Sequence, residues 1–310
     1  MATATAVMPL TFAWLEITGR CNLECTHCYA DSSPDGDHGT MTATDWEHAI
    51  DQLAAMRCDG VQFIGGEPCL HPALPRLIAH ARTRGLGSVE VFSNLTHVPD
   101  HLWECFVAHR VDLATSYYSD QAHEHDAVTA RRGSHKRTRA NIARAQELGL
   151  NLRGGTVVVN DHQRAAQAHA DLRTLGVTQL GADRMRAFGR GTSTPPTVND
   201  LCGHCAQHKC AIGPDGSVWP CVLSRFITVG NVHSQPLADI WTGPALAAAR
   251  AEITSTCGTA AGAQSCTPPQ FLPMCGPCSP CVPSVGHCDP RAATTAPTTA
   301  LPSTGHPQTR

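Results

Sequence analysis

"TGRCNLECTHCYA", residues 18–30, places Cys21, Cys25 and Cys28 close together, directly after the apolar stretch 12–17. Four thiolates usually close an iron–sulfur cluster. On a cubane, three thiolates leave one iron without a protein ligand, and an open metal position is where a small molecule can bind. The loop therefore favours a cluster with an open iron; a zinc site completed by a distant ligand, or three unrelated cysteines, are the alternatives.

Composition narrows the class of protein. The chain has 310 residues, 42% hydrophobic residues and a net charge of −3, so nothing predicts a nucleic-acid or anionic-membrane partner. No apolar run approaches the roughly 18 residues of a transmembrane helix, and the N-terminus lacks the pattern of a secretory signal. We therefore predict a cytoplasmic protein whose 16 cysteines bind metal rather than form disulfides.

Strand and helix patterns alternate from residue 11 to about residue 191. Apolar stretches predict strands at 12–17, 61–64, 89–92, 112–115, 156–159 and 177–187. Thr44 and Glu47 predict a capping box for the first helix. Six strand–helix units imply a parallel sheet with helices outside, whereas eight would complete a TIM barrel. The predicted fold class is α/β, a partial (β/α)6 TIM-type barrel with a small cysteine-rich C-terminal domain.

Unusual residues follow the second and third predicted strands. After the second strand stand Gly65, Gly66, Glu67 and Pro68, and after the third Ser93 and Asn94. Two glycines let a ligand approach the backbone closely. Glu67 can accept a charge-assisted hydrogen bond from an ammonium group of the ligand, although a turn with a solvated glutamate is the simpler interpretation of this motif alone.

The spacing C-x3-C-x2-C followed by Tyr29 resembles the signature of the radical S-adenosylmethionine (SAM) enzymes. "GGEP" then stands where that family places its methionine-binding motif, and Ser93, Asn94 and Ser116 fall where the family contacts SAM. His125-Asp126 is similar to a familiar pair of the family. The arginine that usually follows this aspartate by three residues is Thr129 here; Arg131 or Arg132 either substitutes for it or is a solvated surface residue.

The resemblance implies a mechanism. A [4Fe–4S] cluster on Cys21, Cys25 and Cys28 would bind SAM at its open iron. One electron, from a donor such as flavodoxin or ferredoxin, would cleave SAM to a 5′-deoxyadenosyl radical that abstracts a hydrogen atom from the substrate. The cofactors carry the difficult chemistry, and the protein supplies orientation and excludes water.

Ten further cysteines lie between residues 202 and 288. Cys210 and Cys221 flank a predicted hairpin with Asp215 and Gly216 at its turn. This arrangement resembles the opening of the SPASM extension, which carries auxiliary [4Fe–4S] clusters in radical SAM enzymes. The resemblance implies two auxiliary clusters. The first would use Cys210 and Cys221 with either Cys202 or Cys205.

The second auxiliary cluster would use mainly Cys275, Cys278 and Cys281, with Cys288 as a further metal ligand. A zinc ribbon formed by "CGHC" and "CGPC" is the alternative. Cys257 and Cys266 are left without a role, and Cys58, Cys69 and Cys105 are interpreted as small core residues. We predict a radical SAM core at 1–191, an auxiliary cluster domain at 192–288 and a disordered tail at 289–310.

Family analogy favours a ribosomally made peptide as substrate, modified by crosslinking, epimerisation or oxidation. Sulfatase-activating members carry an acid where Val222 stands, which disfavours that oxidation here. The chain begins close to its first strand, so we expect a separate peptide-recognition protein or direct binding. Oxidation or rearrangement of a small-molecule substrate is the enzymatic alternative. A non-catalytic iron–sulfur or zinc scaffold is disfavoured, because a scaffold needs no open iron.

Overall fold

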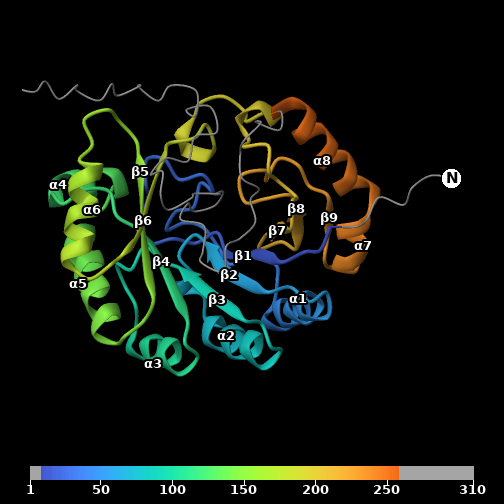
Figure 1. The fold of residues 1–310 in the computed structure, drawn as a ribbon, viewed down its shortest axis with the longest axis horizontal. Helices are drawn as coiled ribbons and strands as arrows, with labels where there is room; N and C mark the ends of the chain where they lie inside the picture. Colours follow the sequence, from blue (N-terminus) through green and yellow to red (C-terminus); the bar gives the residue numbers. More distant parts are fainter. Residues whose placement is uncertain (1–7, 258–310) are drawn as a thin grey trace, which may run out of the picture.

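A nine-stranded sheet organises residues 8–257, the part of the chain that this computed structural model describes. Its spatial order is β6-β5-β4-β3-β2-β1-β7-β8-β9. The strands are β1 (Phe12–Thr18), β2 (Gly60–Gly65), β3 (Ser88–Phe92), β4 (Asp112–Ser116), β5 (Leu152–Val158), β6 (Gln179–Arg184), β7 (Lys209–Ile212), β8 (Ser217–Trp219) and β9 (Gly230–Asn231). Strands β1 to β6 pair in parallel and the sheet stays open, which confirms the predicted partial barrel (Figure 1).

Helices follow most of the strands. They are α1 (Ala43–Ala55), α2 (Leu74–Thr83), α3 (Asp100–Ala108), α4 (Ala122–Thr129), α5 (Ser134–Glu147), α6 (Ala165–Thr174), α7 (Leu237–Thr242) and α8 (Pro244–Cys257). Figure 1 shows α1, α2, α3 and α5 along the outer side of the curved sheet. None of the helices within residues 8–257 has the length and apolar content needed to cross a bilayer.

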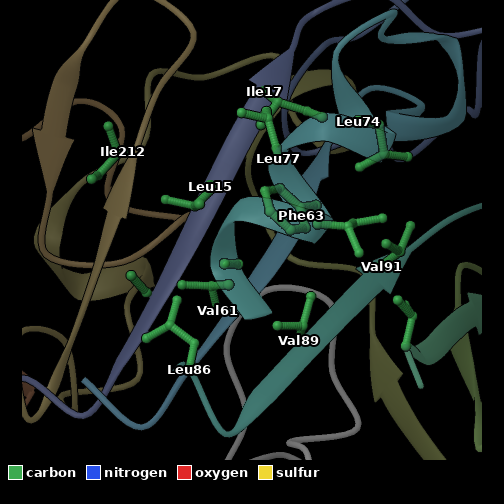
Figure 2. Close-up of a cluster of buried hydrophobic side chains, with 14 of the residues drawn as sticks. Leu15, Ile17, Val61, Phe63, Leu74, Leu77, Leu86, Val89, Val91 and Ile212 are labelled. Carbon is green, nitrogen blue, oxygen red and sulfur yellow. The ribbon is translucent and has the colours of Figure 1, made fainter. Parts of the chain in front are cut away.

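The two faces of the sheet bury different side chains, because successive residues of a strand point to opposite faces. Leu15 and Ile17 of β1 point outward and belong to the outer core between the sheet and the helices. Figure 2 shows them beside Phe63 of β2 and near Leu74 and Leu77 of α2. The opposite face carries a second apolar group, here called the inner cluster. Its buried members are Phe12, Trp14, Ile64, Phe188, Leu201, Cys202, Cys205, Ala211, Trp219, Cys221, Val222, Leu223 and Ile253.

The predicted hairpin is present, but it extends the main sheet instead of forming a separate layer. Its first arm, β7, pairs in parallel with β1, and its second arm, β8, pairs antiparallel with β7. Gly216 has a φ of +81°, and Asp215 accepts a hydrogen bond from the Ser217 backbone N–H at 3.0 Å. The cysteine-rich region therefore begins on the same sheet as the barrel.

Two local predictions were wrong. The capping box of α1 is formed by Thr42 and Asp45, not by Thr44 and Glu47, because the helix begins at Ala43. Helix α4 was not predicted, since its sequence AHEHDAVT has almost no apolar periodicity. That helix ends at Ala130, which adopts a left-handed conformation with a φ of +51°.

A charged network lies inside the barrel and joins three strands. Arg153 of β5 donates to Glu90 of β3 through Nε at 2.6 Å and through Nη2 at 2.9 Å. Gln62 of β2 also donates to Glu90. The side chains of Arg153 and Glu90 are 1% and 0% exposed, so each charge depends on the other for compensation.

Replacing Arg153 with Met is expected to lower the free energy of unfolding by about 3–5 kcal/mol, because Glu90 is left buried and uncompensated. Denaturant unfolding of the cluster-free protein measures the effect. The double variant Arg153→Met/Glu90→Gln should recover much of the loss, since the orphaned charge is gone. A single variant as stable as the wild type would show that water reaches Glu90.

Candidate active site

A cavity opens at the carboxyl ends of the parallel strands, where the fold class predicts chemistry. Among the residues that line it are Cys21, Cys25, Cys28, Tyr29, Gly65, Gly66, Phe92, Asn94, Ser116, Tyr118, His125, Thr129, Thr138, Thr156, Asp183, Arg184, Arg186 and Leu223. Most come from the ends of β1 to β6, and the others come from α4, α5 and the segment after Cys221. The structure thus brings together the three cysteines, both glycines, Asn94 and Ser116, as the sequence predicted.

The backbone of the cysteine loop is fixed by segments distant in sequence. Cys21 N–H donates to Ser33 O at 2.9 Å, and Thr26 N–H donates to Val128 O at 2.9 Å. Burial, with smaller contributions from neighbouring acidic groups, raises the pKa of the Cys21 and Cys25 thiols to about 12. Both are therefore protonated without metal at neutral pH. A coordinated metal deprotonates such thiols outright, so this trio, with Cys21 buried and Cys25 and Cys28 half-buried, fits the three-thiolate side of a [4Fe–4S] cluster.

Arg190 is a residue of this site that sequence reasoning missed. It belongs to the "FGRG" segment after β6 and reaches back across the cysteine loop. Its side chain donates from Nε to Cys25 O at 2.9 Å and from Nη2 to Ser32 O at 2.8 Å. Its Nη1 pairs with Asp31 at 2.8 Å. Arg190 therefore holds the loop and places a positive charge beside the thiols; the isolated arginine in "FGRG" was the only signal.

The two glycines of "GGEP" are required by close contact between backbones. A Cβ on Gly66 would lie 2.1 Å from Arg20 O, and one on Gly65 would lie 2.3 Å from Thr18 O. Gly65 also has a φ of +128°, which side chains rarely allow. The end of β2 can therefore lie directly against the start of the cysteine loop.

Glu67 does not line the cavity, and neither do Pro68 and Ser93. The Glu67 carboxylate is fully buried and accepts three hydrogen bonds from its own chain. Oε1 accepts from Cys69 N–H at 3.0 Å and from Ser93 Oγ at 2.8 Å, and Oε2 accepts from Asn94 N–H at 2.8 Å. Burial raises the pKa of Glu67, and these hydrogen bonds oppose that shift. In this geometry Glu67 ties the ends of β2 and β3 together from behind the cavity wall.

Asn94 connects this tie to the cysteine loop. Its Nδ2 donates to Asn22 Oδ1 at 2.8 Å and lies 3.8 Å from Cys21 Sγ. Its side-chain oxygen accepts from Thr96 N–H at 2.8 Å, so the amide orientation is fixed on both sides. Asn94 is thus positioned by Glu67 and faces both the cavity and a predicted cluster ligand.

Thr129 stands where the family usually has an arginine, so this part of the cavity is lined by hydroxyl groups. Thr129 and Thr138 line the cavity, whereas Arg131 and Arg132 are exposed and lie outside it. Neither arginine therefore substitutes in this geometry. Asp126 caps the start of α5 instead, accepting from Gly133 and His135 N–H groups. The arginines that do line the cavity, Arg184 and Arg186, come from β6 and the residues just after it.

The segment after Cys221 closes one wall of the cavity. Arg225 donates from Nη1 to Ala30 O at 3.1 Å and lies 3.4 Å from Glu16, a buried carboxylate of β1. Glu16 also accepts from the Tyr29 hydroxyl at 3.2 Å. Burial raises the pKa of Glu16, and the Arg225 guanidinium opposes that shift. Val222, in the place of the family's acid, is fully buried.

The structure separates the cysteines of the second region into two groups. Cys202, Cys205 and Cys221 are buried in the inner cluster, whereas Cys210 belongs to the outer core. Within residues 8–257, no three His, Cys, Asp or Glu side chains converge as ligands of a single metal ion. The predicted tail lies outside the described residues. So do the remaining predicted ligands, which are Cys275, Cys278, Cys281 and Cys288.

Comparison with protein families defines the class. Residues 15–172 match the model of the radical SAM superfamily, and residues 202–281 match SPASM, an iron–sulfur cluster-binding domain. The chain therefore belongs to the radical SAM superfamily and is an enzyme that binds [4Fe–4S] clusters and SAM.

Among individual proteins, it is 27% identical to the subtilosin biosynthesis protein AlbA of Bacillus subtilis, over 76% of this chain and 60% of that protein. It is 27% identical to a PqqA peptide cyclase of Xanthomonas campestris, over 76% of this chain and 74% of the cyclase. Mycofactocin maturase MftC of Mycobacterium tuberculosis is 24% identical over 92% of this chain and 85% of its own. The chain thus spans less than two thirds of AlbA.

Solved structures share the fold. Streptococcus suis SuiB bound to S-adenosylmethionine superimposes with a TM-score of 0.66 and 15% identity, over 79% of this chain and 68% of SuiB. The enzyme anSMEcpe with AdoMet and a peptide gives a TM-score of 0.61 at 13% identity, over 77% of this chain and 82% of its own.

Glu67→Gln is expected to destabilise the ligand-free protein by roughly 1.5–3 kcal/mol, because an amide cannot accept on both sides. SAM affinity, measured by titration calorimetry, should fall too, since the tie positions Asn94. If Glu67 only bound the ligand, SAM affinity would fall while the unfolding free energy stayed unchanged. Glu104→Gln on an exposed face of α3 is the matched control.

Burial of His125 is expected to make the free energy of unfolding depend on pH. Its Nδ1 accepts from Tyr118 N–H at 3.3 Å, and burial, with His135 contributing, lowers its pKa from 6.5 to about 4. The unfolded chain therefore binds this proton first, so stability falls as pH drops from about 6.5 toward 4. Relative to His125→Asn, wild-type unfolding free energy should decrease by about 2 kcal/mol between pH 7 and pH 5. A constant difference between the two proteins would mean that His125 is not held neutral.

Proposed function

We propose that this chain is a peptide maturase, which uses SAM to modify a ribosomally made peptide through a crosslink, an epimerisation or an oxidation. The observation that carries the proposal is the similarity, over 76% of the chain, to a protein named PqqA peptide cyclase. SuiB, which shares the fold, has also been solved with a precursor peptide. Peptide binding in those proteins supports a peptide substrate for this one.

In this proposal Cys21, Cys25 and Cys28 hold the cluster that binds SAM, and Gly65, Gly66, Asn94 and Ser116 contact SAM. When bound, the cluster and SAM supply the 5′-deoxyadenosyl radical. Glu67 and Ser93 act from behind the cavity wall, because the buried carboxylate keeps Asn94 in place. Pro68 begins the short 3-10 helix Pro68–Leu70 that follows the glycines.

The other cavity residues would orient the substrate and exclude water. Phe92, Tyr118 and Leu223 give three sides of the cavity an apolar lining. Such a lining protects a radical from side reactions. Asp183, Arg184 and Arg186 add charge at the end of β6, where polar groups of a peptide can be bound. A flavodoxin or ferredoxin as electron donor, and a separate peptide-recognition protein, complete the proposal.

The test is reconstitution. Anaerobically prepared protein is incubated in H2O or D2O with SAM, dithionite and short peptides encoded by the neighbouring genes, and the products are analysed by mass spectrometry. We expect 5′-deoxyadenosine together with a peptide that has lost two hydrogen atoms, or that takes up solvent deuterium if it is epimerised. The control Cys21→Ala/Cys25→Ala/Cys28→Ala should produce neither and should lack about four irons.

Two outcomes would contradict the proposal. If 5′-deoxyadenosine forms while a small metabolite is consumed and no peptide is modified, the small-molecule alternative is correct. If the triple variant still releases 5′-deoxyadenosine, the three cysteines do not hold the cluster that cleaves SAM.

A further inference from the structure

We propose that Cys202, Cys205, Cys221 and Cys257 are the four ligands of one auxiliary [4Fe–4S] cluster, and that Cys210 is not a ligand. This inference does not depend on the proposed peptide substrate; it takes the auxiliary group to be an iron–sulfur cluster, as the match to SPASM supports. It replaces the ligand set expected from the sequence, in which Cys210 and Cys221 bind the first auxiliary cluster together. It also gives Cys257 the role that the sequence left open.

Three of these cysteines are buried in the inner cluster, and two of their thiols are in contact. The Sγ atoms of Cys205 and Cys221 lie 3.1 Å apart, and Cys202 is buried in the same inner cluster. The backbone fixes the arrangement, because Ala206 N–H donates to Pro220 O at 3.0 Å. Ser224 Oγ accepts from Cys221 N–H at 2.8 Å. The loop that carries Cys202 and Cys205 therefore packs against the loop that carries Cys221.

Cys257 reaches this group from the last position of α8. Its Sγ donates to Leu201 O at 3.5 Å, the carbonyl directly before Cys202, and to Val198 O at 3.2 Å. One turn earlier in the helix, Ile253 is fully buried in the inner cluster. Residues four apart share one face of a helix, so the packing of Ile253 directs Cys257 toward the same place.

Cys210 lies on the opposite face of the sheet. Strand β7 pairs Cys210 with Ala13 and Ala211 with Trp14 of β1. Ala211 and Trp14 belong to the inner cluster, whereas Cys210 and Ala13 belong to the outer core. Burial, with Cys58 contributing, raises the pKa of Cys210, and Cys58 follows the outer helix α1. Cys210 could join the other thiols only if β7 shifted by one residue, which would turn every side chain of the strand to the wrong face.

The donor set has a chemical consequence. Four thiolates close a [4Fe–4S] cluster completely, and a closed site has no position for a substrate. The cluster would therefore carry electrons or hold the fold, while SAM and substrate meet at the three-cysteine loop. The ligands join α8 and two loops, so cluster binding would also stabilise this part of the chain.

The test counts iron in the background Cys21→Ala/Cys25→Ala/Cys28→Ala, where only auxiliary iron remains. Adding Cys257→Ala should remove about four irons per chain, or convert one cluster to a three-iron form that electron paramagnetic resonance detects. Cys202→Ala, Cys205→Ala and Cys221→Ala should do the same. Cys210→Ala is the control for Cys202, Cys205 and Cys221, since it is buried as they are, and it should keep all auxiliary iron and an unchanged spectrum.

Circular dichroism checks that each variant folds. Cys257→Ala is the decisive variant, because its side chain is only partly buried and its loss should disturb packing least. If Cys257→Ala keeps the full iron content and the same spectrum, the inference is overturned and the fourth ligand lies elsewhere. Loss of about four irons in Cys210→Ala would overturn it as well. A parent that binds zinc and no auxiliary iron would overturn this inference but would leave the proposed peptide maturase untouched, so the two failures can be told apart.

Discussion

Strand β1 pairs in parallel with β2 on one side and with β7 on the other, and both cysteine regions depend on this pairing. The loop after β1 carries Cys21, Cys25 and Cys28, while β7 begins the hairpin that ends at Cys221. Because carboxyl ends of parallel strands meet at one edge, the cysteine loop lies beside "GGEP" of β2. The same register turns Trp14 and Ala211 to one face, where Cys202, Cys205 and Cys221 belong to the same inner cluster.

Polar groups of the site act mainly on one another. Both carboxylate oxygens of Glu67 accept hydrogen bonds from within the chain. The side-chain amide of Asn94 donates to Asn22 and accepts from Thr96. Each buried polar group without a partner would cost roughly 1–3 kcal/mol, so these bonds hold the loops in one arrangement before a ligand enters. A cavity prepared in this way loses little conformational freedom on binding.

Much of the fold was predictable from sequence because apolar periodicity follows from burial. The six parallel strands and the position of the cysteine loop needed no knowledge beyond that pattern. The spacing around Cys210 does not record that Lys209–Ile212 is a strand whose alternate residues face opposite sides, which puts Cys210 in the outer core and Cys205 and Cys221 in the inner cluster. The tie made by Glu67 and the clamp made by Arg190 join segments far apart in sequence, and no local pattern records such contacts.

Two half-buried arginines lie beside the thiols of the cysteine loop. The Arg190 guanidinium lowers the pKa of Cys25, against the larger effect of burial, and Arg225 is within electrostatic reach of Cys28. The pKa of Arg225 is raised by Glu16, Tyr29 and Cys28 although its burial acts in the opposite direction. Thiolates gathered in a medium of low dielectric repel one another, and two arginines offset part of that repulsion. Both arginines come from beyond β6, so the loop becomes a complete site only when the later segments have folded against it.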